Sequence, residues 1–219
     1  MVHAVFFDFD GTLADTAPDL GHALNRQRIA RNLKPLPLDI IRTQASAGAR
    51  GLLKIGFDIE PEDQDYIEMR DEFLAFYTQR LCHDTQLFPG IAELLDQLDA
   101  QNMPWGIVTN KPARFTHPLI AQLGLQQRAA SIVCGDETNH TKPHPEPLLA
   151  ACRKIDVLPT DCLYLGDDQR DVKASLAAGM EPFIALYGYL GNDQPPETWG
   201  ARYMISHPQD LIAYLPVKW

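Results

Sequence analysis

Five short apolar runs, rich in β-branched and aromatic residues, lie along the chain at residues 4–7, 105–108, 131–134, 162–165 and 183–186. Amphipathic stretches of helical period alternate with the last four runs, at residues 91–98, 115–123, 147–155 and 171–178. Continuous apolar strands that alternate with helices are typical of a parallel sheet covered by helices on both faces. We therefore predict an α/β fold whose core is a Rossmann-like parallel sheet.

One stretch, residues 15–87, does not follow this alternation. It contains no convincing strand, and we predict helices at residues 19–33, 38–45 and 62–82. In the last of these, apolar residues recur at spacings of three and four and form one stripe: Tyr66, Met69, Phe73, Tyr77 and Leu81. Because about seventy residues is too long for a structureless loop, residues 15–87 are predicted to be a helical insert. Residues 1–14 and 88–219 then form the core.

Composition limits the partners of the chain. Its 219 residues are 45% hydrophobic, enough for one large domain or for a core with an insert. The 29 acidic and 19 basic residues give a net charge of −10, which disfavours binding to nucleic acid or to an anionic membrane. The four cysteines form no CxxC pair, and the N-terminal apolar run lacks the basic start and the length of an export signal. We expect a cytoplasmic monomer or small homo-oligomer with no nucleic-acid or membrane partner.

Acidic residues follow two of the predicted strands. Asp8 and Asp10 end the first strand, and Asp167 and Asp171 follow the run at 162–165. A polar turn and a helix cap are the plainer explanations for such residues, but neither requires so many acids. Because open parallel sheets bind ligands beyond the carboxyl ends of their strands, we expect the acids to converge in one crevice. Like charges that close need a counter-cation, and Mg²⁺ prefers such oxygen ligands.

Donors for an anionic group are expected at the same edge of the sheet. Thr109 follows the second strand and Lys142 follows the third, so they would supply a hydroxyl and a cation that face a phosphate. Gly11 and Thr12 suit a close approach of backbone to an anion. Taken alone, Lys142 could equally be a solvated surface lysine. Local positive charge from a metal and the lysine would exceed the screened field of the distant negative surface, so an anionic substrate is compatible with the net charge.

Four short motifs follow one another in the chain: DFDGTL from Asp8, VTNK from Val108, KP from Lys142 and GDDQRD from Gly166. In this order they resemble the motifs of the haloacid dehalogenase superfamily, over residues 4–187. Within it the chain is similar to the phosphoglycolate phosphatase group with a helical cap. This resemblance implies that residues 15–87 are a cap that controls substrate specificity and that residues 1–14 and 88–219 are the catalytic core. Residues 104–112, 187–189 and 199–201 resemble, more closely still, the N-acetylmuramic acid 6-phosphate phosphatases. Asp168 and Arg170 depart from the Ser and Asn that are common in the phosphoglycolate group, which leaves the substrate open.

The resemblance implies a Mg²⁺-dependent phosphatase and a role for each matching residue. Asp8 would be the nucleophile that forms an aspartyl phosphate, and Asp10 would protonate the leaving alkoxide and then activate water. Mg²⁺ would be held by Asp8, by the backbone carbonyl of Asp10 and by Asp167, with Asp171 behind them. Stabilisation of the transferring phosphoryl group would come from Thr109 and Lys142.

Further substrate contacts are expected from both parts of the chain. In the core they would come from Gly11, Thr12, Asn110 and Lys111. In the cap, Arg50 lies in a glycine-broken segment at 46–51, where the related phosphatases place a substrate loop. Arg50 would pair with a substrate carboxylate, which both 2-phosphoglycolate and N-acetylmuramic acid 6-phosphate carry. The other interpretation of Arg50 is a solvated arginine at the start of a surface helix.

Three other activities remain open from the sequence. A haloacid dehalogenase shares the Asp nucleophile but acts on carbon and needs no metal, so EDTA separates it from a phosphatase. A phosphomutase would give a stable product without free phosphate. A phospho-acceptor switch also uses Mg²⁺ and an Asp, but it lacks a helical insert after the first strand and would not release phosphate over many turnovers.

Overall fold

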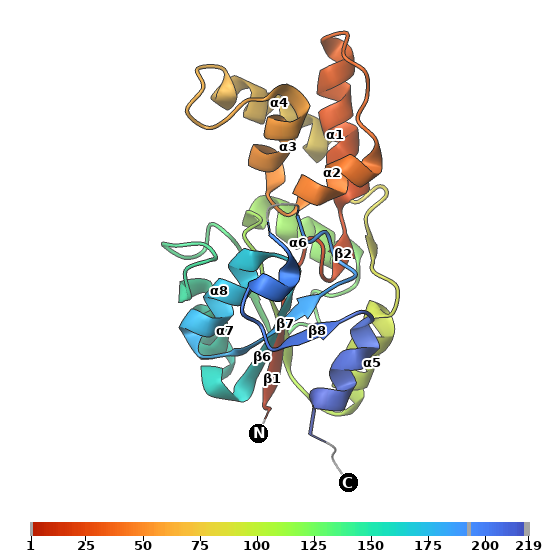
Figure 1. The fold of residues 1–219 in the computed structure, drawn as a ribbon. Helices are drawn as coiled ribbons and strands as arrows, with labels where there is room; N and C mark the ends of the chain where they lie inside the picture. The colour runs from red at the N-terminus through yellow and green to blue at the C-terminus, as the bar shows by residue number, and fades with distance from the viewer. Residues whose placement is uncertain (1, 192–193, 217–219) are drawn as a thin grey trace.

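The computed structural model describes residues 2–191 and 194–216, and its core is a six-stranded sheet (Figure 1). Neighbouring strands are all parallel, in the order β5-β4-β1-β6-β7-β8. The predicted α/β fold with a parallel sheet is therefore confirmed. The strands are β1 (Ala4–Phe7), β4 (Trp105–Val108), β5 (Ser131–Val133), β6 (Cys162–Gly166), β7 (Glu181–Ala185) and β8 (Tyr203–Ile205).

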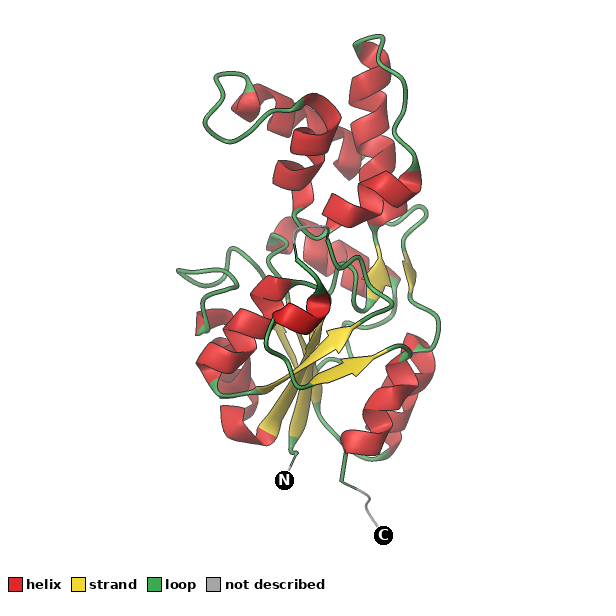
Figure 2. Ribbon diagram, in the orientation of Figure 1, coloured by secondary structure: helices red, strands yellow, loops and turns green. Residues whose placement is uncertain are grey.

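Helices cover both faces of this sheet, as Figure 2 shows. Successive side chains of a strand point to opposite faces. Phe7 of β1 therefore packs in an apolar cluster with α5 and α6, and Phe6 packs in another with α7 and α8. The helices are α5 (Ile91–Ala100), α6 (Ala113–Gln122), α7 (Glu146–Ile155) and α8 (Gln169–Ala178), with short 3₁₀ helices η1 (Pro159–Asp161), η2 (Pro196–Thr198) and η3 (Pro208–Tyr214).

A second group of helices stands apart from the sheet and forms the cap (Figures 1 and 2). Its apolar centre includes Met69, Phe73 and Tyr77 of the predicted stripe, with Leu81 partly buried against it. Within residues 2–191 and 194–216, no helix has both the length and the apolar character needed to cross a membrane. The cap helices are α1 (Ala17–Ala30), α2 (Leu38–Ala45), α3 (Gly48–Phe57) and α4 (Tyr66–Thr78), and they lie between β2 (Ala14–Asp15) and β3 (Gln86–Leu87).

Three strands and one α-helix differ from the sequence prediction. The absence of strands from residues 15–87 was wrong, because β2 and β3 pair antiparallel there, but strands of two residues leave no readable pattern. Helix α3 was not predicted, since its three glycines disfavour a helix; packing of its buried Leu52 and Leu53 stabilises it. Strand β8 was missed because it is an edge strand in which only Ile205 is fully buried.

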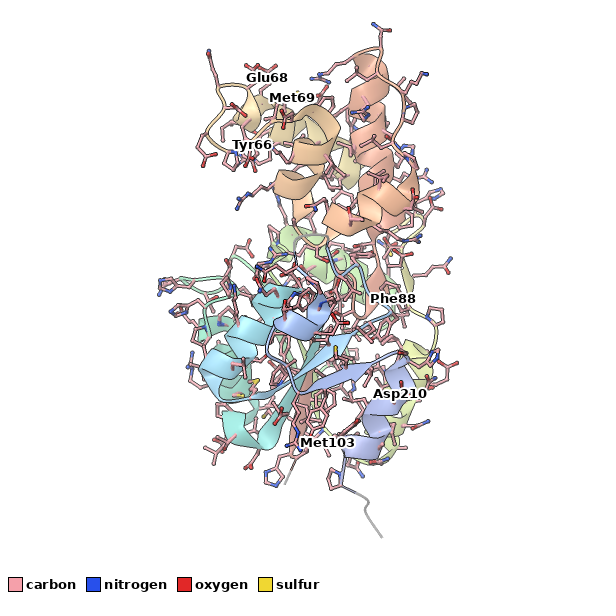
Figure 3. All side chains as sticks on the ribbon, in the orientation of Figure 1. Tyr66, Glu68, Met69, Phe88, Met103 and Asp210 are labelled. Atoms are coloured by element: carbon pink, nitrogen blue, oxygen red, sulfur yellow. The ribbon has the colours of Figure 1, made fainter. Side chains whose placement is uncertain are left out.

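Asp19, near the start of α1, joins the two chain segments that connect the cap to the core. Its fully buried carboxylate accepts hydrogen bonds from the backbone N–H of Asp84 at 3.1 Å and of Thr85 at 3.0 Å, and from the Thr85 hydroxyl at 2.8 Å. Phe88 directly follows β3. In Figure 3 it lies between the cap helices and Met103, which marks the far end of the core. Asp19 therefore ties the outgoing segment of the chain to the returning one.

We expect Asp19→Ala to lower the free energy of unfolding by about 1–3 kcal/mol, because buried N–H donors lose their acceptor. Denaturant titration measures this loss. Glu68→Ala is the matched control, since Glu68 is exposed on α4 and the change is expected to stay within about 0.5 kcal/mol. Equal stability of the two variants would contradict the role of Asp19.

Candidate active site

Three carboxylates and one ammonium group meet at the carboxyl ends of the central strands. Asp8 follows β1, Asp167 and Asp171 follow β6, and one oxygen of each lies within 4.8 Å of the others. Lys142 Nζ lies 2.8 Å from Asp8 Oδ1 and 2.7 Å from Asp171 Oδ1. All four side chains are buried. The structure thus brings together these four residues from three separate segments of the sequence.

Lys142 lies in the loop between β5 and α7, and its neighbours hold it in place. Its N–H donates to Asn110 Oδ1, and its carbonyl accepts from Asn110 Nδ2, each at 2.9 Å. Lys142 Nζ also donates to the Val108 carbonyl at 3.0 Å and to the Tyr164 hydroxyl at 2.9 Å. The Asn110 amide therefore positions the lysine. Asn110 also lines the cavity between the cap and these residues, and its predicted contact with the substrate stays a prediction.

The three acids carry more negative charge than Lys142 can balance. Burial raises the pKa of Asp8 to about 7, although the Lys142 charge opposes this. Burial also raises the pKa of Asp167 well above its usual value, and the charges of Asp8 and Asp171 add to the effect. If all three carboxylates were ionised, one ammonium would leave two negative charges uncompensated. A divalent cation would balance them, and a set of oxygen donors fits Mg²⁺.

Three hydrogen-bond donors and the close backbone of Gly11 orient the Asp167 carboxylate. Thr12 Oγ1 donates to Asp167 Oδ1 at 2.9 Å. The Tyr189 N–H at 2.9 Å and Ser46 Oγ at 3.0 Å donate to Oδ2. Gly11 has a φ of +86°, and a Cβ there would lie only 2.2 Å from Asp167 Oδ2. Gly11 and Thr12 therefore surround this carboxylate, and their predicted contact with the substrate stays a prediction.

Asp10 makes its own ion pair, separate from Lys142. Lys111 Nζ lies 2.9 Å from Asp10 Oδ1, and Thr16 Oγ1 donates to the same oxygen at 2.5 Å. Lys111 Nζ also lies 4.9 Å from the centre of the Tyr77 ring. Burial alone would lower the pKa of Lys111, but the neighbouring Asp10 holds it above its usual value. Lys111 is therefore charged and fixes the direction of the Asp10 carboxyl group.

A cavity of about 270 Å³ lies between the cap and these residues. Asp8, Asp10, Thr109 and Lys142 line its core side. Thr109 Oγ1 accepts a hydrogen bond from the Lys111 N–H at 3.1 Å, so its own O–H can still donate to a bound anion. Most of the remaining wall is apolar, and it includes Leu20, Phe73, Leu74, Tyr77 and Phe115.

Arg50 lies outside this cavity. It is an exposed residue of α3 and lines a neighbouring cavity of about 390 Å³ with Lys54 and Trp199. Ser46 and Arg170 border both cavities, and Arg170 Nη2 donates to the Ser46 carbonyl at 2.9 Å. Neither residue was predicted to belong to the site. For Arg170 the available signal was its place in the GDDQRD motif.

Other residues that hold the acids have little sequence signal. Tyr189 donates its hydroxyl to Asp15 at 2.8 Å, which connects the segment after β7 to the start of the cap. Asp168 is the N-cap of α8, and its N–H donates to Asp171 Oδ2 at 3.0 Å. The acidic start of α8 therefore both caps the helix and supplies Asp171 to the cluster.

The fold and the site have counterparts among known proteins. The sequence profile of the haloacid dehalogenase-like hydrolases matches residues 5–185. The chain belongs to the haloacid dehalogenase-like hydrolase family. The resemblance carried by the four motifs is confirmed, and the chain is a hydrolase.

Members of this family with assigned names cover nearly the whole chain. An N-acetylmuramic acid 6-phosphate phosphatase of Pseudomonas putida is 39% identical over 210 residues, which are 96% of this chain and 94% of the relative. A phosphoglycolate phosphatase of Xanthomonas campestris is 39% identical over 217 residues, 99% and 96% of the two chains. The crystal structure of a predicted phosphoglycolate phosphatase from Haemophilus somnus has a TM-score of 0.85 at 26% identity, and covers 97% of each chain.

We expect Gly11→Ala to cost more stability than Gly124→Ala. Both glycines have positive φ, at +86° and +74°, so each alanine loses about 1–2 kcal/mol to backbone strain. Only the Cβ at position 11 would overlap Asp167, whereas no atom outside the glycine and its chain neighbours lies within 4 Å of the one at position 124. Overpacking adds about 1–3 kcal/mol at position 11. Denaturant titration of both variants measures the difference, and equal losses would contradict the close contact.

Proposed function

We propose that this hydrolase is a Mg²⁺-dependent phosphomonoester phosphatase that acts through an aspartyl phosphate. The buried cluster of Asp8, Asp167, Asp171 and Lys142 carries the proposal, because its excess negative charge requires a cation and its lysine faces an anion. The phosphatase names of the relatives agree with this chemistry.

In the first step, an Asp8 carboxylate oxygen attacks the phosphorus of the ester. A P–O bond forms to Asp8 while the P–O bond to the leaving alcohol breaks. Asp10, which must enter this step protonated, gives its proton to the departing alkoxide oxygen. Asp10 then takes a proton from water, and the resulting hydroxide attacks the phosphorus. The bond to Asp8 breaks and inorganic phosphate leaves. The contacts of Asp10 with Lys111 and Thr16 hold its carboxyl group toward the cavity for both proton transfers.

Mg²⁺ would be held by Asp8, Asp167 and the backbone carbonyl of Asp10, with Asp171 behind them. When bound, it neutralises charge on the phosphoryl oxygens and orients them. The Lys142 ammonium group also stabilises the charge on the phosphoryl oxygens, and the Thr109 hydroxyl donates a hydrogen bond to one of them. Asp171 keeps Lys142 in position through their 2.7 Å ion pair.

We further propose N-acetylmuramic acid 6-phosphate as the substrate, ahead of 2-phosphoglycolate. Ligand pockets for molecules of moderate size have volumes of about 300–1,000 Å³. A cavity of about 270 Å³ with an apolar wall is near that range, and it matches a sugar phosphate with apolar substituents better than a two-carbon acid. Both relatives at 39% identity act, by name, on one of these two esters.

The four cysteines form no disulfide, which agrees with the reducing cytoplasm proposed as the location.

A dehalogenase would need neither Asp10 nor a cation. Release of free phosphate over many turnovers would exclude both a phosphomutase and a phospho-acceptor switch.

Phosphate release tests the reaction directly. We expect the wild type with Mg²⁺ to release phosphate from N-acetylmuramic acid 6-phosphate over many turnovers, and EDTA to stop the reaction. Asp8→Asn removes the nucleophile, so its release should fall to background, and Asp10→Asn should lose about 10²–10⁴-fold. Asp156→Asn, an exposed change away from the site, is the control. EDTA-resistant turnover, or wild-type release by Asp8→Asn, would refute the mechanism.

Mg²⁺ binding has a second readout in thermal stability. A cation that binds only the folded state raises its stability, by about 2.7 kcal/mol at a hundredfold excess over Kd. We expect Mg²⁺ to raise the Tm of the wild type and to raise that of Asp167→Asn much less. The Mg²⁺ concentration for half-maximal phosphate release should increase at least about 10-fold in this variant. Unchanged titrations in both assays would remove Asp167 from the metal ligands.

A further inference from the structure

One face of α4 forms part of the cavity wall. Arg70, Phe73, Leu74 and Tyr77 line the cavity, and their spacing of three and four places them on one side of the helix. Tyr77 lies nearest the chemistry, because its ring contacts Lys111, which pairs with Asp10. Arg70 is two helical turns away from Tyr77, or about 10 Å along the axis at the usual rise.

Figure 3 helps to place the start of this helix. The labelled Tyr66, Glu68 and Met69, which precede Arg70, lie in the cap well away from the core. Arg70 therefore belongs to the end of the cavity wall that is remote from Asp8, with the rings of Phe73 and Tyr77 between them along the helix face.

Among the described residues, four cationic side chains line this cavity, and three of them are committed to acids of the core. Lys142 pairs with Asp8 and Asp171. Lys111 pairs with Asp10.

Arg170 is the third committed cation. Its guanidinium forms two 2.8 Å hydrogen bonds, from Nε and Nη2, to the two oxygens of Asp168.

Arg70 is the fourth cationic side chain, and it pairs with an exposed acid of the cap rather than with an acid of the core. Its Nε and Nη2 donate to a single oxygen of the adjacent, exposed Asp71, at 3.1 and 2.8 Å. Such a surface ion pair is weak and exchanges with solvent. Arg70 can therefore turn its planar fork to a carboxylate in the cavity, the group that a guanidinium binds best.

We propose that Arg70 binds the substrate carboxylate at the end of the cavity remote from Asp8. The inference rests on the proposed phosphatase function and narrows its substrate class. With phosphate at Asp8, a carboxylate at Arg70 must be separated from it by a spacer the length of a sugar ring. The lactyl carboxylate of N-acetylmuramic acid 6-phosphate meets this condition. In 2-phosphoglycolate only one CH₂ group and the ester oxygen separate the carboxylate from the phosphorus, too short a spacer for both contacts.

The matched pair of N-acetylmuramic acid 6-phosphate and N-acetylglucosamine 6-phosphate tests this contact, because the second sugar lacks the lactyl carboxylate. We expect the wild type to prefer the muramic ester in kcat/KM. Arg70→Ala should reduce this ratio about 10- to 100-fold, the range for one charge-assisted hydrogen-bonded contact. The loss should be mainly a higher KM for the muramic ester. Arg70→Lys keeps the charge without the fork and should retain part of the preference.

Arg50→Ala is the matched control, because Arg50 is also an arginine of the cap but lines the neighbouring cavity. We expect it to keep the wild-type ratio. An unchanged ratio in Arg70→Ala, or a lost preference in Arg50→Ala, would overturn the assignment to Arg70. A wild type with equal kcat/KM for the two sugars would overturn it as well and leave the phosphatase intact. Release from neither sugar nor 2-phosphoglycolate would overturn both proposals.

Discussion

The site depends on the ion pairs that the buried ammonium group of Lys142 makes with Asp8 and Asp171. Parallel strands bring their carboxyl ends to one edge, so Asp8 after β1 and the acids after β6 are forced close together. Burial and mutual repulsion oppose their ionisation, as the raised pKa of Asp8 shows. Lys142 offsets part of this cost by pairing with two of the acids, and Asn110 holds its backbone from the next loop. Because one cation is not enough for three acids, the same arrangement that stabilises the site also prepares it for a metal.

The cap takes part in this charge balance through a small number of polar contacts. Ser46, just before α3, donates to Asp167, and its carbonyl accepts from Arg170 of the core. Tyr189 connects Asp167 to Asp15 at the base of the cap, through its N–H at one end and its hydroxyl at the other. The position of the cap and the orientation of Asp167 are therefore coupled. In the proposed mechanism, the cap would shield the aspartyl phosphate from bulk water.

The cavity between the two parts has a polar end and an apolar side. The core supplies the charged end with Asp8, Asp10 and Lys142, while the cap supplies aromatic and aliphatic side chains. This division separates the chemistry from the choice of substrate. Under the proposed function, the groups that act on phosphorus come from strand ends, whose positions the sheet determines. The groups that would meet the rest of the ester come from helix faces, which can change without disturbing the sheet.

Much of the core and the acids could be predicted from the sequence, because they depend on local patterns. Apolar runs predicted five strands of the parallel sheet, and the position of Asp8, Asp10 and Asp167 after such runs predicted one crevice. Strand β8 and helix α3 escaped prediction because tertiary packing overrides their weak local preferences. The tertiary structure alone decided which groups face the cavity. It placed Asn110 both against the Lys142 backbone and on the cavity wall, turned Thr12 to Asp167, and placed Arg70 rather than Arg50 on the wall of this cavity. The period of a helix shows which residues share a face, but only the packing of α3 and α4 against their neighbours determines what that face meets.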